Sequence, residues 1–134
     1  MRKGFTLVEL LIVLAVIAAL MAVATPMALS AVKTAKASQV AQNLNALKSA
    51  VEQYVYSEKA LPSNITALTN YMSKIPDGYI VTPDATTFVK GEATVTVAYT
   101  VGDILPVDVN KQYSEAGTVT GNYPGVYVKV RQWW

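Results

Sequence analysis

The stretch that decides the fold is GFTLVELLIVLAVIAALMAVA, residues 4–24. From Phe5 to Ala24 it provides about 20 residues, the length that an α-helix needs to cross the hydrocarbon core of a bilayer. Arg2 and Lys3 precede it, and the positive-inside rule places such a basic end in the cytoplasm. The sequence therefore predicts a single membrane span with a cytoplasmic N-terminus.

Glu9 is the one carboxylate in this apolar run. A carboxylate in a membrane helix costs about 2.5–3.5 kcal/mol at the helix centre and less near an end, so we expect it to have a partner. Residues 5–24 contain no Lys, Arg or His. The cation must then come from the chain's own N-terminus, from another protein or from the headgroup region. Cleavage after Gly4 would create one at Phe5.

Residues 2–9, RKGFTLVE, and the apolar run after them closely resemble the class III signal of type IV pilins and type II secretion pseudopilins. In that family a membrane peptidase cuts after the glycine and methylates the new phenylalanine amine. The acid then pairs with the N-terminus of a neighbouring subunit during assembly. The resemblance thus implies processing at Gly4 and Phe5 and an assembly contact between Phe5 and Glu9. Pro26 matches the proline that breaks the helix near the membrane exit in the family.

The resemblance also implies partners and a location. The chain would polymerise with its own copies into a helical filament, served by a prepilin peptidase and methylase, an assembly ATPase and a polytopic platform protein. It would cross the inner membrane once before assembly and lie in an extracellular, cell-surface fibre afterwards. No cofactor, metal or catalytic activity is expected.

Two alternatives for this segment stay open. In an ordinary secretory signal peptide, Arg2 and Lys3 would form the basic region, residues 10–24 the apolar region and residues 22–24 an A-x-A cleavage site. Against this stand Glu9 and the apolar face that continues past the cut, through residues 27–32. A plain single-span anchor is the second alternative.

Composition limits what the remainder can be. The chain has 134 residues, which leaves room for one soluble domain of about 100 residues. Removal of Arg2 and Lys3 from its 11 basic residues leaves 9 against 9 acidic ones, so the mature chain has no net charge to attract nucleic acid. Absence of His and Cys argues against zinc, thiol and Ser-His-Asp chemistry. It also removes the disulfide with which many pilins staple their C-terminal region.

A helix is predicted from Phe5 to about Glu58, roughly 80 Å long, with a kink at Pro26. Residues 28–58 contain no Gly or Pro and are rich in good helix formers. In this half, apolar residues at three- and four-residue steps form one stripe that should pack on the soluble domain. Its members are Val40, Leu44, Leu47, Val51, Tyr54 and Val55.

The segment after the helix is predicted to turn. Ser63 is a candidate N-cap for a short helix over residues 65–72, and a Pro-Gly turn follows at residues 75–78. Asn64 begins the sequon Asn-Ile-Thr and is a candidate glycosylation site, although such triplets are common by chance.

From residue 79 on, β-branched and aromatic runs predict antiparallel strands at residues 79–81, 87–89, 93–101 and 126–130. Residues 107–109 are a candidate further short strand, within an irregular loop over residues 102–125. In the third run the odd-numbered positions are apolar, and Thr94, Thr96, Ala98 and Thr100 alternate with them, which predicts a sheet with one wet face.

The predicted fold class is therefore α+β, a long kinked N-terminal helix with a membrane half and an amphipathic half, the latter packed on a small antiparallel sheet. Residues 1–4 would be the cleaved leader, residues 5–29 the membrane and fibre-core half of the helix, and residues 30–134 the soluble head.

Two sets of polar residues are candidate binding sites. Oxygen ligands of the kind that calcium prefers lie in the irregular loop, but their spacing matches no fixed calcium motif and favours ordinary turn chemistry. They are Asp103, Asp108, Asn110, Glu115 and Asn122. At the end of the chain, charged and aromatic side chains are candidates for nucleic-acid contact, although such residues more often cover a sheet edge. They are Lys129, Arg131, Trp133 and Trp134.

The sequence thus predicts a structural subunit of a type IV pilus-like fibre. A type II secretion pseudopilin and a membrane-anchored binding module that does not polymerise are the alternatives. Adhesion, motility, DNA uptake and secretion are all compatible with this prediction.

Overall fold

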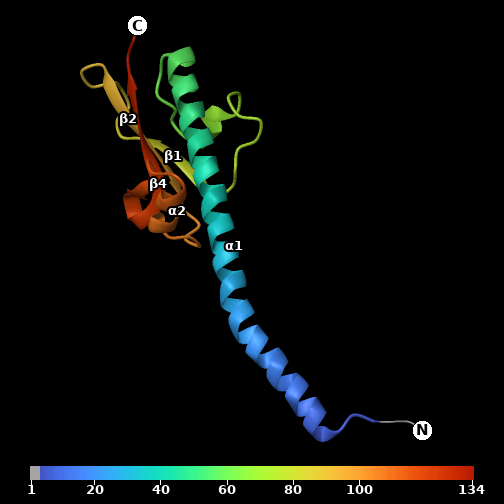
Figure 1. Ribbon diagram of the computed structural model, residues 1–134. Coiled ribbons are helices and arrows are strands. Elements are labelled where there is room, and N and C mark those ends of the chain that lie inside the picture. Colours follow the sequence, from blue (N-terminus) through green and yellow to red (C-terminus); the bar gives the residue numbers. More distant parts are fainter. Residues whose placement is uncertain (1–3) are drawn as a thin grey trace. The chain divides into compact units, whose positions relative to one another are not determined.

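The computed structural model describes residues 4–134, so Arg2 and Lys3 of the predicted leader lie outside the described residues. Figure 1 shows the elements in chain order. They are α1 (Leu7–Glu58), the 3₁₀ turn η1 (Ile65–Leu68), β1 (Tyr79–Pro83), β2 (Glu92–Tyr99), α2 (Pro106–Gln112), β3 (Gly117–Val119), the 3₁₀ turn η2 (Thr120–Asn122) and β4 (Tyr123–Arg131). The chain divides into two compact units, one ending at Thr34 and the other spanning Ala35–Trp134.

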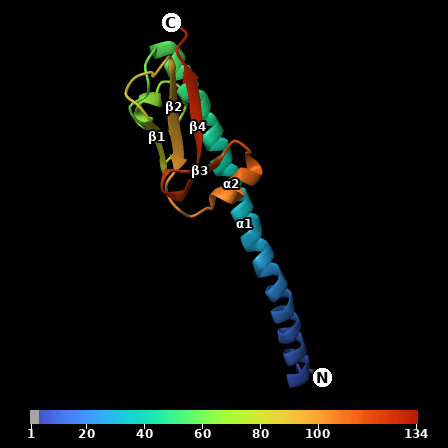
Figure 2. The same ribbon diagram turned by 90° about the vertical axis from the view of Figure 1, so that its left-hand side faces the viewer.

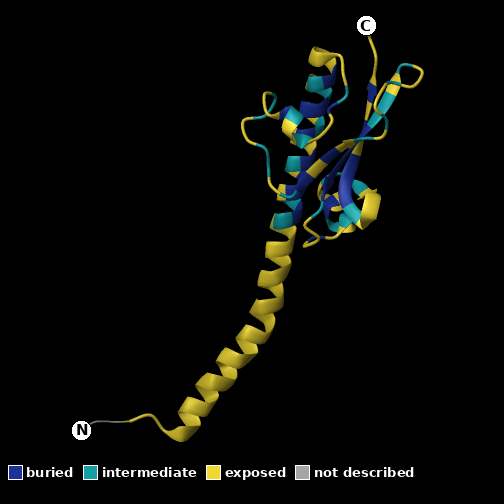
Figure 3. Ribbon diagram, turned by 180° about the vertical axis from the view of Figure 1, so that it is seen from behind, coloured by how far each residue is buried: buried dark blue, intermediate teal, exposed yellow. Residues whose placement is uncertain are grey.

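The first unit consists of the N-terminal part of α1 and the short segment before it. Its helix contains an 18-residue window with a mean hydropathy of 2.9, none of it buried, which is long and apolar enough to cross a membrane. Figure 3 shows this part of α1 as exposed throughout. Helix α1 continues without interruption through Pro26, which confirms the long helix, whereas the kink at Pro26 stays a prediction.

The second unit has two layers, the C-terminal half of α1 and a four-stranded antiparallel sheet. Figure 2 shows the sheet lying along one side of this half of α1. The predicted stripe is the contact surface, since all its members except the partly buried Tyr54 are at most 1% exposed. Valines from β1, β2 and β4 face it, and each fully buried side chain of this size stabilises the unit by about 1.5–3 kcal/mol. The predicted α+β class is confirmed.

The strand order is β1-β2-β4-β3, so the last strand lies inside the sheet and not at its edge. Val97 of β2 lies opposite Val81 of β1 and opposite Val126 of β4, which places three valines in one row of the core. The predicted strands at residues 79–81, 93–101 and 126–130 are confirmed with slightly different bounds.

Two predicted strands are wrong. Residues 87–89 form no strand, because only Val89 pairs, with Glu92. Lys90 and Gly91, with positive φ angles of 54° and 79°, form the two-residue hairpin turn between these two residues. Residues 107–109 belong to helix α2, since Pro106 has its fixed φ at the first helical turn and Val109 is buried on the inner side.

The predicted loop at residues 102–125 and the predicted short helix also need correction. The loop contains α2, β3 and the start of β4, with Gly121 and Asn122 at positive φ making the β3–β4 turn. The short helix is only the 3₁₀ turn η1, and its N-cap is Asn64, not Ser63. The Asn64 Oδ1 accepts a 3.3 Å hydrogen bond from the Ala67 N–H, which holds the first turn.

The outer face of the sheet is less wet than predicted. Thr96 and Ala98 are 6% and 1% exposed, although alternation places them on the solvent side. Strand β2 lies between β1 and β4, so Ile80 flanks Ala98 and Tyr127 flanks Thr96 on that face. Small side chains in a central strand are therefore covered by larger neighbours.

Candidate processing and assembly site

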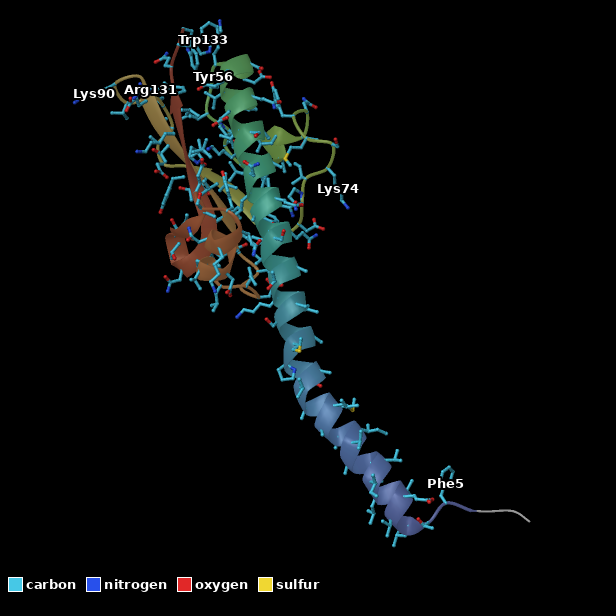
Figure 4. All side chains as sticks on the ribbon, viewed as in Figure 1. Phe5, Tyr56, Lys74, Lys90, Arg131 and Trp133 are labelled. Atoms are coloured by element: carbon cyan, nitrogen blue, oxygen red, sulfur yellow. The ribbon has the colours of Figure 1, made fainter. Side chains whose placement is uncertain are left out.

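The segment before α1 is short and exposed. Gly4, Phe5 and Thr6 have no regular secondary structure, and Phe5 is 89% exposed. Figure 4 shows the Phe5 side chain projecting from the start of the helix. Together with Glu9, these three residues line a shallow depression. The two residues of the predicted cleavage junction and the predicted assembly acid thus lie together.

Thr6 and Glu9 bond to each other in a reciprocal cap. The Thr6 N–H donates to Glu9 Oε2 at 3.1 Å, and the Glu9 N–H donates to Thr6 Oγ1 at 3.1 Å. Two of the N–H groups that a helix start leaves without a helical acceptor are satisfied in this way. The negative carboxylate also lies at the positive end of the helix dipole. Within residues 4–134, Glu9 therefore has a partner on its own chain, the backbone N–H of Thr6.

Thr6 is the residue that the sequence analysis missed. The signal was present, because Thr-x-x-Glu directly before an apolar run is the sequence pattern of a capping box. Residues 6–9 therefore belong to a capping box as well as to the signal motif.

The chemistry of the depression changes if the chain is cut. In the uncut chain the Phe5 nitrogen is a neutral amide. Hydrolysis after Gly4 would make it an amine with a pKa of about 8, positively charged at neutral pH. The amine would then lie four residues before Glu9, and the arrangement would offer one cation and one anion at the same helix end.

Pro26 lies inside α1, and its predicted effect on the helix stays a prediction. Since proline has no N–H, it cannot donate to the carbonyl of Ala22, the acceptor one helical turn earlier. This carbonyl is available to another donor.

The candidate calcium ligands are dispersed among other contacts. Asp103 Oδ2 lies 3.7 Å from Lys36 Nζ, and Asp108 Oδ1 lies 3.7 Å from Lys111 Nζ. The Asn110 amide donates to two backbone carbonyls of the loop that follows α2. Within residues 4–134, no group of three or more His, Cys, Asp or Glu side chains is placed to hold a metal ion.

Glu115 joins the loop to helix α1. Its carboxylate accepts hydrogen bonds from Lys48 Nζ and, at 2.8 Å, from Tyr113 Oη. The hydrogen bond from Lys48, followed by that from Tyr113, lowers the pKa of Glu115, and the same bond raises the pKa of Lys48. This residue thus acts as a link between the loop and the helix.

Two of the four C-terminal candidates lie on strand β4 and two follow it. Lys129 and Arg131 are exposed on the outer face of β4, and Arg131 Nε lies 2.9 Å from Glu92 Oε1. Trp133 is 63% exposed, with Lys59 Nζ 5.2 Å from its ring centroid.

Trp134 completes an aromatic cluster at this end of the second unit. Its ring makes edge contacts with Trp133 at 5.9 Å and with Phe88 at 5.2 Å. Figure 4 shows Trp133, Arg131 and Tyr56 at the same end. The tryptophans thus lie with Lys59 and Phe88, which the sequence analysis did not single out, and nucleic-acid contact stays a prediction.

Asn64 is exposed, as a glycosylation site must be, but its side chain is also the N-cap of η1. Glycosylation at this residue stays a prediction.

Comparison with known proteins connects the N-terminal geometry to a family. Residues 1–25 match the model described as the prokaryotic N-terminal methylation motif. Over 102 residues the chain is 30% identical to the type IV major fimbrial protein FimA of Dichelobacter nodosus, and the match covers 75% of this chain and 64% of that relative. No solved structure matches the chain.

Proposed function

Because residues 1–25 match the N-terminal methylation motif and the chain is similar to a type IV major fimbrial protein, we propose that the chain is a structural subunit of a type IV pilus-like fibre. A prepilin peptidase cuts after Gly4 and methylates Phe5, and the mature subunits polymerise through their N-terminal helices. The subunit acts as building material and catalyses no reaction.

The observation that carries this proposal is the contrast between the two units. The second unit has its own complete core, built from α1, the sheet and α2. The first unit is a helix whose apolar side chains are exposed on every side, from Leu7 to Val32. A helix that is hydrophobic all round is stable only in lipid or against other apolar helices.

Lipid and fibre can each cover this helix. Before assembly it crosses the inner membrane, and afterwards it packs against the same helix of neighbouring subunits in the fibre core. Since lipid tails and packed apolar helices are both apolar surroundings for these side chains, transfer of the helix from lipid to the fibre core is nearly balanced in free energy. An assembly ATPase and a platform protein then drive and direct it.

Glu9 gives the fibre its register in this proposal. Within the core only a cation can hold its carboxylate charged, and each mature subunit brings one, the Phe5 amine. Pairing of Glu9 with the amine of an adjacent subunit fixes the axial position, because a misplaced subunit leaves both charges buried alone at a cost of about 3–5 kcal/mol.

The intact mass of the subunit from purified fibres tests the proposal. We expect a chain that begins at Phe5 and carries one methyl group. A chain that begins at Thr25 would instead show signal-peptide cleavage after residues 22–24 and would refute the proposal. Fibres on cells must also disappear when the chain is deleted. Persistence of the fibres would favour an anchored binding module.

Calcium separates a pilus subunit from the secretion pseudopilin. Carboxylates of the 102–125 region contact lysine and tyrosine side chains and form no metal-binding group among the described residues. We therefore expect calcium to leave the melting temperature of the purified chain unchanged, compared with magnesium as the control. An increase specific to calcium would favour the pseudopilin.

A further inference from the structure

We infer that Thr6 is a positioning residue for leader cleavage, which keeps the bond between Gly4 and Phe5 outside the helix. The inference rests on the proposed processing after Gly4. Neither the proposed pairing of Phe5 with Glu9 nor the apolar run needs a threonine at residue 6.

The start of α1 is close to the cleavage junction. The first backbone hydrogen bond of the helix runs from the Leu10 N–H to the Thr6 carbonyl, at 3.1 Å. Gly4 and Phe5 precede it, without helical structure and exposed to solvent. Only Thr6 separates the junction from the first helical residue, Leu7.

Without the cap, the helix would extend through the junction. The next acceptor for the Glu9 N–H is the carbonyl of Phe5, and the next for the Val8 N–H is the carbonyl of Gly4, which is the carbonyl to be attacked. Near an apolar environment an N–H group must find a partner, so either a cap or a longer helix has to supply it. Thr6 Oγ1 takes the Glu9 N–H at 3.1 Å and thereby removes the first bond of the extension.

Cleavage needs the non-helical form for a chemical reason. Water adds to the Gly4 carbonyl carbon, the bond to the Phe5 nitrogen breaks, the carboxylate stays on Gly4, and the nitrogen leaves as an amine that takes up a proton. A carbonyl held in a helical hydrogen bond is enclosed by the helix backbone and cannot be polarised or approached in this way. Exposed segments outside regular structure are accordingly where proteolysis concentrates.

The test is pulse-chase cleavage of the full chain in membranes that contain the peptidase. Thr6→Ala removes the cap and also introduces the best helix former, and we expect cleavage about fivefold slower than in the wild type, the effect of a lost helix cap. Thr6→Ser keeps the hydroxyl and should cleave at the wild-type rate. Thr25→Ala is the matched control, the same exchange on α1 away from the junction, and should also cleave normally.

A second measurement reads the helix start directly. Carbon chemical shifts of Gly4 and Phe5 in the full uncut chain, in lipid bicelles, should be non-helical in the wild type and in Thr6→Ser, and shift toward helical values in Thr6→Ala. Wild-type cleavage rates in Thr6→Ala, or unchanged shifts, would overturn the inference and leave the proposed function intact. Failure of the wild-type chain to be cleaved after Gly4 would overturn both.

Discussion

Replacement of Glu9 by alanine should affect the unassembled subunit little and fibre formation strongly. In the structure Glu9 contributes one capping acceptor, for the Thr6 N–H, and the loss of such a cap costs about 1 kcal/mol. The reverse bond, from the residue 9 N–H to Thr6 Oγ1, needs only the backbone and survives the exchange. Leader cleavage and membrane insertion should therefore remain largely intact.

In the proposed fibre the same exchange has a much larger effect. The Phe5 amine of the adjacent subunit loses its counter-charge in an apolar core, which costs about 3–5 kcal/mol for each contact. Since about 1.4 kcal/mol is a factor of ten, association weakens by about 10²- to 10⁴-fold at each added subunit. Glu9→Asp, whose carboxylate is one methylene shorter, should lie between alanine and the wild type.

The assay compares two pools of the same chain. Fibres are sheared from cells and quantified, and the mature subunit is measured in membranes for each variant. We expect the alanine variant to retain its membrane pool and to lose its fibres. Normal fibre yield from Glu9→Ala would show that the acid is not the assembly contact.

Three further predictions concern the two units separately. Leu44→Ala should lower the free energy of unfolding by about 2–5 kcal/mol in urea denaturation, because Leu44 is completely buried, and a wild-type midpoint would contradict the packing described. Glu115 has a pKa below its ordinary value, so its contribution to stability is present above the pKa of the unfolded chain and is lost as pH falls through the lower folded pKa. Glu115→Gln should therefore flatten the dependence of the urea midpoint on pH between 7 and 3. Identical pH profiles for the wild type and the variant would exclude a contribution of the Glu115 carboxylate to stability. Pro26 should bend α1 in a map of the fibre, and an unbroken straight helix through Pro26 would refute the kink.

Periodicity was sufficient to predict most of the architecture. The stripe from Val40 to Val55 arises from burial against another layer, which the order of apolar residues reports directly. The motif predicted Gly4, Phe5 and Glu9 as site residues, and their roles stay predictions. The sequence predicted a cation as the partner of Glu9, whereas the partner among the described residues is a backbone N–H.

Two of the wrong predictions have physical causes that the pattern of residues does not reveal. Val107 and Val109 have β-branched side chains that favour a strand, but Pro106 begins a helical turn there and Val109 is buried in it. Thr96 and Ala98 look solvent-facing from alternation alone, and their burial depends on which strands become their neighbours. A proline next to the segment decides the first case, and strands distant in sequence decide the second.

The position of β4 inside the sheet also determines when the second unit can fold. As the chain is synthesised, β1 and β2 can pair early, but one edge of β2 stays open until residues 123–131 arrive. The apolar stripe on α1 likewise stays partly uncovered until the valines of β4, more than half the chain away, have been synthesised. Contacts between such distant segments form slowly, and an open strand edge beside an apolar stripe invites wrong pairing. The growing chain is therefore most vulnerable to aggregation and proteolysis until its last strand has been inserted.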